Sequence, residues 1–220
     1  MKNRILLTLL SLVTASTLCL GQQQSFDLQQ LLKEKKLIIF NGNVVPITDG
    51  NRKGVSMVPA GKKDFSEGVV WLKGVTFSTG TIEIDLRGKD VLQKSFIGVA
   101  FHGLDSVTHD IVYFRPFNFQ SKDSVRKIHA VQYVSHPDFP WYKLREERNG
   151  VYEKGIDPPP SPAGWFHAKI EVGETQIKVY VNNASTPSLT VDKLNSRRSG
   201  MIGLSNEGLP GDFANLTISK

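Results

Sequence analysis

From residue 37 to the end of the chain, short apolar segments alternate with turn residues. Each segment is rich in Val, Ile, Phe or Tyr and is bounded by Gly, Asn, Asp or Pro, a pattern typical of β-strands. The predicted strands cover residues 37–40, 55–58, 68–72, 79–87, 96–102, 110–117, 125–135, 165–172, 176–181, 188–191, 200–205 and 213–219. No long amphipathic helix interrupts them, which argues against βαβ units. The pattern therefore predicts an all-β sandwich of two antiparallel sheets.

The strand predicted at 96–102 has one apolar face and one face of small side chains. Alternate apolar residues form the first face, and Gly98, Ala100 and His102 form the second. Small side chains leave room for another group to approach the strand. We therefore expect a concavity here, with His102 at its end.

The segment 109–119 also reads as a strand, and its two faces differ in another way. Val112 and Phe114 form a core face. The opposite face mixes apolar and polar groups: Ile111, Tyr113, Arg115, Phe117 and Phe119. Pro116 cannot donate to a ladder, so an edge or a bulge is expected there. The mixed face predicts either the lining of a groove or a surface strand on which Arg115 keeps its charge in water.

Residues 136–164 have no strand pattern, and so long a connection is uncommon in a compact domain. It is too apolar for a free tail, because it contains Phe139, Trp141, Tyr142, Leu144 and Tyr152. We expect it to pack on the sandwich as a lid or rim.

Residues 1–21 have the basic start, short apolar run and small residues of a secretory signal peptide. The one cysteine, Cys19, would leave with it, and the Leu18 before it does not fit a lipid-attachment site. The mature chain is then exported, to the periplasm or the medium, without disulfides. Residues 22–36 form an N-terminal segment, either a short helix or an extended entry, and residues 37–220 form the sandwich domain.

The net charge of +6 is spread along the chain and does not form a basic stripe interleaved with aromatic residues. Nucleic-acid binding is therefore not expected. No run after the signal peptide is long enough to cross a bilayer.

Glu83 and Asp85 lie two residues apart on a predicted strand, so they share a face. Paired carboxylates serve as acid and base in glycosidases. A sandwich glycosidase built on such a strand is expected to carry a third acid at position 87, where this chain has Arg87. We interpret the three as a charged outer face and keep Glu83, Asp85 and Glu146 as candidate acids or bases.

Other catalytic motifs do not occur. The histidines lack the spacing of a helical zinc site, so no metal site is predicted. There is neither a Gly-x-Ser-x-Gly elbow nor a Gly-x-Gly-x-x-Gly loop after a strand. No cofactor is expected, while a structural calcium ion stays open.

Aromatic and polar side chains suited to a small ligand gather around the expected groove. Sugar recognition needs flat apolar faces and planar polar groups, and a concave site with a few polar groups is the usual small-ligand site. The candidate ligand-binding residues are His102, Tyr113, Arg115, Asn118, Gln132, Tyr133, Trp141 and Arg145. Gln132 and Tyr133 point to opposite faces of their strand, so only one lines the groove. The sequence leaves open which one.

Five segments carry a resemblance to a known family: residues 80–90, 96–102, 112–118, 129–137 and 211–216. They resemble secreted bacterial proteins related to the 3-keto-disaccharide hydrolase domain family. That family is similar to family 16 glycoside hydrolases and concanavalin A-like lectins. The resemblance implies a two-sheet jelly roll with sugar binding or cleavage on its concave sheet.

Three functions follow as hypotheses. The first is a secreted monomer that binds a saccharide on the concave sheet. The second is a glycoside hydrolase acting on an unusual, 3-keto or otherwise oxidised, sugar. The third is a structural or protein-interaction sandwich with no sugar site.

Overall fold

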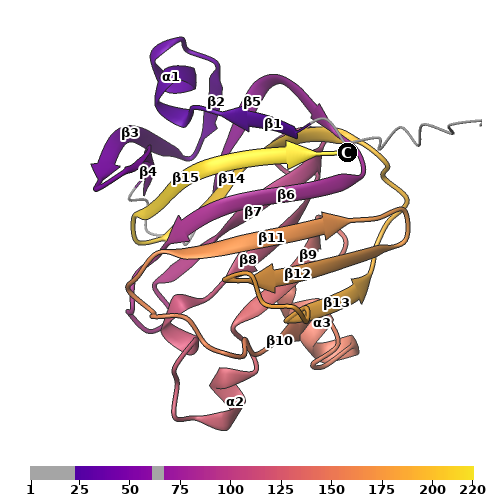
Figure 1. Ribbon diagram of the computed structural model, residues 1–220. Helices are drawn as coiled ribbons and strands as arrows, with labels where there is room; N and C mark the ends of the chain where they lie inside the picture. Colours follow the sequence, from indigo (N-terminus) through magenta and orange to yellow (C-terminus); the bar gives the residue numbers. More distant parts are fainter. Residues whose placement is uncertain (1–22, 61–66) are drawn as a thin grey trace, which may run out of the picture.

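The computed structural model describes residues 23–60 and 67–220. The predicted signal peptide, with Cys19, lies outside these residues. The strands form two sheets that lie face to face, and every pairing is antiparallel (Figure 1). None of the helices in the two described ranges has the length and apolar character needed to cross a membrane.

One sheet, here called the front sheet, lies toward the viewer in Figure 1. Its strand order is β13-β12-β11-β6-β15-β4-β3, and β1 pairs with β15. Its strands are β1 (Gln23–Phe26), β3 (Gly42–Asp49), β4 (Arg52–Pro59), β6 (Gly80–Arg87), β11 (Phe166–Val172), β12 (Gln176–Val181), β13 (Leu189–Asp192) and β15 (Gly211–Ser219). Because β1 pairs with β15, part of the segment before residue 37 belongs to this sheet.

The other sheet, the rear sheet, has the order β10-β9-β8-β7-β14-β5-β2. Its strands are β2 (Leu37–Phe40), β5 (Gly68–Phe77), β7 (Ser95–Gly103), β8 (His109–Phe114), β9 (Val131–His136), β10 (Glu153–Lys154) and β14 (Gly200–Gly208). The helices are short: α1 (Leu28–Lys33), α2 (Ser124–Lys127), α3 (Trp141–Glu147) and the 3-10 turn η1 (Pro116–Asn118). The lid predicted at 136–164 contains α3 and β10.

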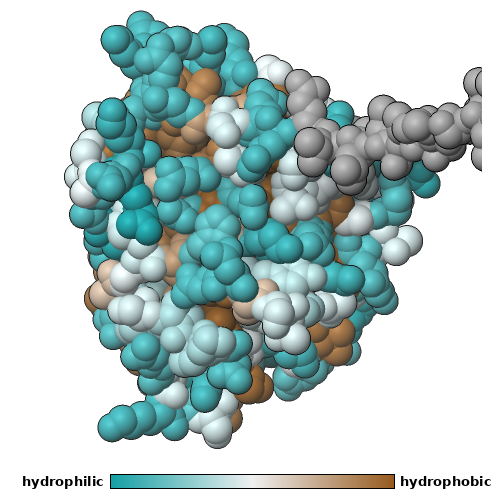
Figure 2. All heavy atoms as spheres, in the orientation of Figure 1, coloured by the Kyte–Doolittle hydropathy of each residue, from teal (hydrophilic) through white to brown (hydrophobic). Residues whose placement is uncertain are grey.

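The core lies between the sheets and contains the apolar face predicted for the strand at 96–102. Ile82, Ile84 and Leu86 of β6 are fully buried, as are the alternate apolar residues of β7. The opposite face of β6 belongs to the outer surface of the front sheet. Figure 2 shows that this surface is largely hydrophilic.

Two strand predictions are wrong in part. Residues 124–127 form α2, because the Asp123 side chain caps the helix by accepting from the Val125 and Arg126 amides, and β9 begins at Val131. The strand predicted to 117 ends at Phe114, and Pro116 begins η1.

Phe119 lies in the core and not on the mixed face expected for it. The backbone turns at η1 and sends Phe119 inward, where its ring meets Phe166 at 5.1 Å between centroids. The strand β3 was not predicted. It is an edge strand that carries Pro46, and an edge is where a sheet tolerates proline.

Candidate functional site

A groove runs along the outer face of the rear sheet. It consists of two cavities, of ≈ 240 Å³ and ≈ 720 Å³, which share Phe96, Tyr113, Trp141 and Glu207. The smaller cavity is also lined by Glu67, Ile111, Val134, His136, Pro140, Tyr142 and Ser205. The larger is also lined by Leu92, Gln93, Lys94, Arg115, Phe117, Asn118, Arg126, His129 and Arg145. The larger volume is in the range of small-molecule sites, which is roughly 300–1,000 Å³.

A row of side chains in register crosses the floor of this groove. Ser205, Gly98, Tyr113, Gln132 and Glu153 are consecutive partners on β14, β7, β8, β9 and β10. Residues opposite one another in a ladder point to the same face. Since Tyr113 lines both cavities, Gln132 and not Tyr133 is on the groove side of β9. Gln132 is buried and lines neither cavity itself, but it accepts hydrogen bonds from Tyr113 and Arg115.

Arg115 forms hydrogen bonds with two residues of this row, Tyr113 and Gln132. Its Nη2 atom donates to the Tyr113 hydroxyl at 2.6 Å and to the Gln132 side-chain oxygen, and the Tyr113 hydroxyl donates to that same oxygen at 2.7 Å. Burial is the main reason that the pKa of Tyr113 is raised to about 12, so the phenol stays a neutral donor at physiological pH.

Glu153 supplies the negative charge under the groove. Its carboxylate accepts from Arg145 at 3.0 and 2.8 Å and from Arg115 at 3.3 Å, and His129 Nδ1 lies 2.8 Å away. Burial alone would raise the pKa of Glu153, but the hydrogen bonds from Arg145 and the charge of Arg115 outweigh it and hold the pKa below its ordinary value. The two guanidiniums are thus fixed by a buried carboxylate that is 2 % exposed.

Aromatic side chains form the open wall. Trp141 begins α3 and is 48 % exposed, and the Arg145 guanidinium lies 5.2 Å from its ring centroid. The Phe96 ring packs against the Tyr113 ring at 6.3 Å. A flat apolar surface therefore faces a row of fixed polar groups.

Asn118 places an unused acceptor beside this wall. It is 4 % exposed, and its Nδ2 atom donates to the His129 carbonyl at 3.0 Å. Among residues 23–60 and 67–220, no group donates to its Oδ1 atom. The Oδ1 atom is itself buried, so this acceptor is left unpaired at a cost and is not open to a ligand in the groove.

Gly98 does not open the groove as its small size suggested. A Cβ atom at this position would lie 2.2 Å from the Val112 carbonyl oxygen, 2.6 Å from Tyr113 Cα and 2.7 Å from Tyr113 Cβ. The missing side chain makes room for the β8 backbone and for Tyr113 rather than for a ligand. We expect Gly98→Ala to lower the free energy of unfolding by ~1–3 kcal/mol through overpacking. Chemical denaturation checks this, and an unchanged midpoint would contradict the close packing of Tyr113.

Two residues expected in the groove lie instead in the core. His102 is fully buried because a β-bulge at this point of β7 breaks the alternation, and His102 itself has a φ of 51°. Tyr133 is also fully buried, on the face of β9 opposite to Gln132. The prediction that they line the groove is therefore corrected.

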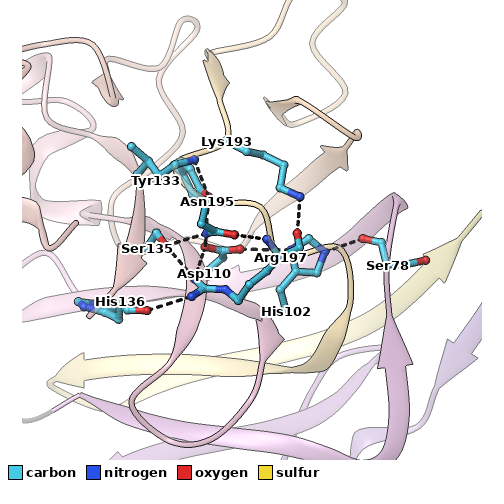
Figure 3. Close-up of polar contacts among 10 residues, drawn as sticks. Ser78, His102, Asp110, Tyr133, Ser135, His136, Lys193, Asn195 and Arg197 are labelled. Atoms are coloured by element: carbon cyan, nitrogen blue, oxygen red, sulfur yellow. Dashed lines mark hydrogen bonds and ion pairs between the residues drawn. The ribbon is translucent and has the colours of Figure 1, made fainter. Parts of the chain in front are cut away.

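Both residues belong to a buried polar network centred on Asp110 (Figure 3). The Asp110 carboxylate accepts from Asn195 Nδ2 at 2.6 Å, Arg197 Nη2 at 2.8 Å and the Tyr133 hydroxyl at 3.2 Å. His102 bridges this carboxylate, at 3.2 Å, to the Ser78 carbonyl, at 2.7 Å. The network therefore joins two of the connections in which the chain passes between the sheets, β5–β6 and β13–β14.

The candidate acids from the sequence lie elsewhere. Glu83 and Asp85 are on the outer face of the front sheet, the hydrophilic face of Figure 2. Asp85 accepts from Asn215 at 2.8 Å and Arg52 at 3.1 Å, and His167 Nδ1 lies 2.9 Å away. Glu146 is exposed on α3 and lines neither cavity.

The acids that do line the groove, Glu67 and Glu207, were not singled out in the sequence. Glu207 shares a strand face with Ser205, and that alternation was the only available signal. Within the described ranges, no group of three or more His, Cys, Asp or Glu residues is placed to hold a metal ion.

No family model matches the chain, and no curated protein matches its sequence. Solved structures do match its fold. The carbohydrate-binding module CBM66 from Bacillus subtilis has a TM-score of 0.58 at 15% identity, over 84% of this chain and 96% of that one. A protein of unknown function with a galectin-like fold, also from Bacillus subtilis, has a TM-score of 0.59 at 15% identity, over 89% and 94%.

A third similar structure is a family 16 endo-glucanase from Bacteroides ovatus, in complex with G4G3G-2F-DNP. It has a TM-score of 0.56 at 9% identity, over 84% of this chain and 95% of that one. Identities this low carry the fold and not the activity. The chain is an all-β jelly-roll sandwich of two antiparallel sheets.

Proposed function

We propose that this protein binds a saccharide in the groove on the outer face of the rear sheet. The single observation that carries this is the pairing of an exposed Trp141 ring with a floor of fixed polar groups at Tyr113 and Arg115. One face of a pyranose ring is rich in C–H groups and packs on an aromatic ring. Its hydroxyls need donors and acceptors whose positions are already set.

The polar groups meet that need in kind. Arg145 presents N–H donors on a guanidinium that Glu153 holds, beside the Tyr113 hydroxyl and the Arg115 guanidinium, which are fixed by hydrogen bonds to each other and to Gln132. Because these groups are already ordered, a ligand loses little free energy in arranging them. The similar carbohydrate-binding module and endo-glucanase support the proposal by analogy of fold.

Trp141→Ala is expected to weaken saccharide binding by at least about tenfold, which is ~1.4 kcal/mol. The reason is the loss of the stacking surface. The test measures affinity by calorimetry across soluble gluco-, galacto-, manno- and fructo-oligosaccharides and 3-keto disaccharides. Trp165→Ala is the matched control, since Trp165 lies beside Arg87 of the front sheet, 4.7 Å from ring centroid to guanidinium carbon.

The control variant should bind as the wild type does. Equal losses in both variants, or no binding by the wild type to any member of the panel, would contradict the proposed function.

The proposal also includes export of the chain and a monomeric state. Cell fractionation tests the export, and size-exclusion chromatography tests the monomeric state.

A further inference from the structure

Two carboxyl groups stand side by side at one end of the groove. Gly68 pairs with Asn206 at the end of the antiparallel β5–β14 ladder. Glu67, just before β5, and Glu207 of β14 are therefore the next residues beyond this pair. Both side chains line the smaller cavity, and Glu207 also lines the larger one. The groove that holds the aromatic wall therefore also holds a pair of acids.

The surroundings of the two carboxyls differ. Glu67 accepts from the Ser205 hydroxyl at 2.6 Å, and its other oxygen lies 3.7 Å from His109 Nε2 and 3.8 Å from His136 Nε2. Burial alone would raise the pKa of Glu67, but His109 and the Ser205 hydrogen bond hold it below its ordinary value. Glu67 is therefore an ionised carboxylate at neutral pH.

Glu207 has the opposite environment. In the part of the chain that the structure describes, its carboxyl makes no hydrogen bond or ion pair, and it faces Glu67 from the β5 side and Tyr113 and Arg115 from β8. Burial, and then the charge of Glu67, raise the pKa of Glu207 to about 7, while Arg115 opposes the rise. Two acids whose environments separate their protonation states form the usual pattern of a general acid and a general base.

We propose that the groove cleaves glycosidic bonds, with Glu207 as the general acid and Glu67 as the general base. This rests on the proposed saccharide site. Glu207 gives its proton to the glycosidic oxygen as the bond from the sugar carbon to that oxygen breaks. A water molecule bonds to the same carbon and gives a proton to Glu67. One water is consumed, two saccharide hydroxyls are made, and the proton on Glu67 returns to Glu207 through solvent.

The other acids near the groove are less suited to these roles. The Glu153 carboxylate is already bound by Arg115 and Arg145, so it is a poor base. Glu83 and Asp85 are separated from the groove by the thickness of the sandwich, because they lie on the outer face of the other sheet.

The test uses the mature chain and compares two leaving groups. The probes are α- and β-linked disaccharides of glucose, galactose and mannose, and the 2,4-dinitrophenyl glycosides of the same sugars. Dinitrophenolate leaves without a proton, so a missing general acid affects these substrates little. Glu207→Gln is expected to lower disaccharide turnover about 10²–10⁴-fold, with a much smaller loss on the dinitrophenyl glycoside.

Glu67→Gln should lower turnover of both kinds of substrate, and Glu171→Gln, on the front sheet, should lower neither. Calorimetry of the same variants keeps binding separate from turnover. Saccharide binding with no turnover by the wild type would overturn the catalytic proposal and leave the proposed function standing. Equal losses on both leaving groups in Glu207→Gln would also overturn the acid role. No binding at all would overturn both proposals.

Discussion

Replacing Asp110 with alanine is expected to lower the free energy of unfolding by ~3–5 kcal/mol, since it removes one partner of a buried ion pair. Asp110 is fully buried and faces Arg197 at 2.8 Å. Its loss leaves the guanidinium of Arg197 without its counter-charge and the amide of Asn195 without its shortest acceptor. A domain is stable by only about 5–15 kcal/mol, so the variant is expected to melt far below the wild type.

The pH dependence of this effect has a defined sign. Burial alone would raise the pKa of Asp110, but the His102 hydrogen bond and the charge of Arg197 outweigh it and hold the pKa below its ordinary value. The stabilisation that the Asp110 carboxylate charge supplies is therefore fully present above the pKa of Asp110 in the unfolded chain, about 3.9. It is lost as the pH falls through the pKa of Asp110 in the folded protein. The gap in stability between the wild type and Asp110→Asn should narrow below about pH 4.

Thermal and urea unfolding of Asp110→Ala, Asp110→Asn and Asp192→Asn measure both effects. Asp192 accepts one exposed hydrogen bond from Gln176, so its variant should match the wild type. A loss of stability in Asp110→Asn that does not change with pH would contradict the assigned role of the carboxylate charge.

Glu153→Ala is expected to lower stability by a similar ~3–5 kcal/mol and also to weaken saccharide binding. Arg115 is 5 % exposed and would keep a buried charge without its carboxylate. Arg145, freed from two hydrogen bonds, would no longer hold its place beside Trp141. Both the floor and the wall of the groove would lose order.

Glu153→Gln separates the two consequences, because it keeps the shape of the side chain and removes its charge. Urea unfolding and calorimetry with the best ligand of the panel measure stability and affinity. Wild-type affinity in Glu153→Ala would show that the arginines need no fixed position, and the account of the groove floor would then be wrong.

The fold was predictable because most strands repeat a simple pattern. The apolar residues at 82, 84 and 86 of β6 alternate with charged ones, and only one face of a sheet can be buried. The wrong and the missing strand predictions have local causes. Asp123 caps a helix turn inside a predicted strand, and β3 was missed because its exposed edge needs little apolar sequence.

The site was predictable only in part. Tyr113 and Arg115 were found from one strand, since they share a mixed face. The choice between Gln132 and Tyr133 needed the strand pairing. Alternation shows which residues of a strand share a face, but it does not show which of the two faces is turned to the core. His102 was misplaced because a bulge leaves no mark in the composition of the strand.

The pairing of Glu67 with Glu207 could not be predicted at all. These residues lie far apart in the sequence, and only the β5–β14 register brings them together. Strand order brings the two acids together, and a single sequence does not encode strand order as a local pattern.

The most direct test of the saccharide groove is amide chemical-shift mapping of the mature chain with the tightest-binding oligosaccharide of the panel. We expect shifts along β8, β9 and α3, at Tyr113, Gln132 and Trp141, and none around Glu83 and Asp85 on the front sheet. Shifts confined to the front sheet, or no shifts with any oligosaccharide, would contradict the proposed saccharide groove.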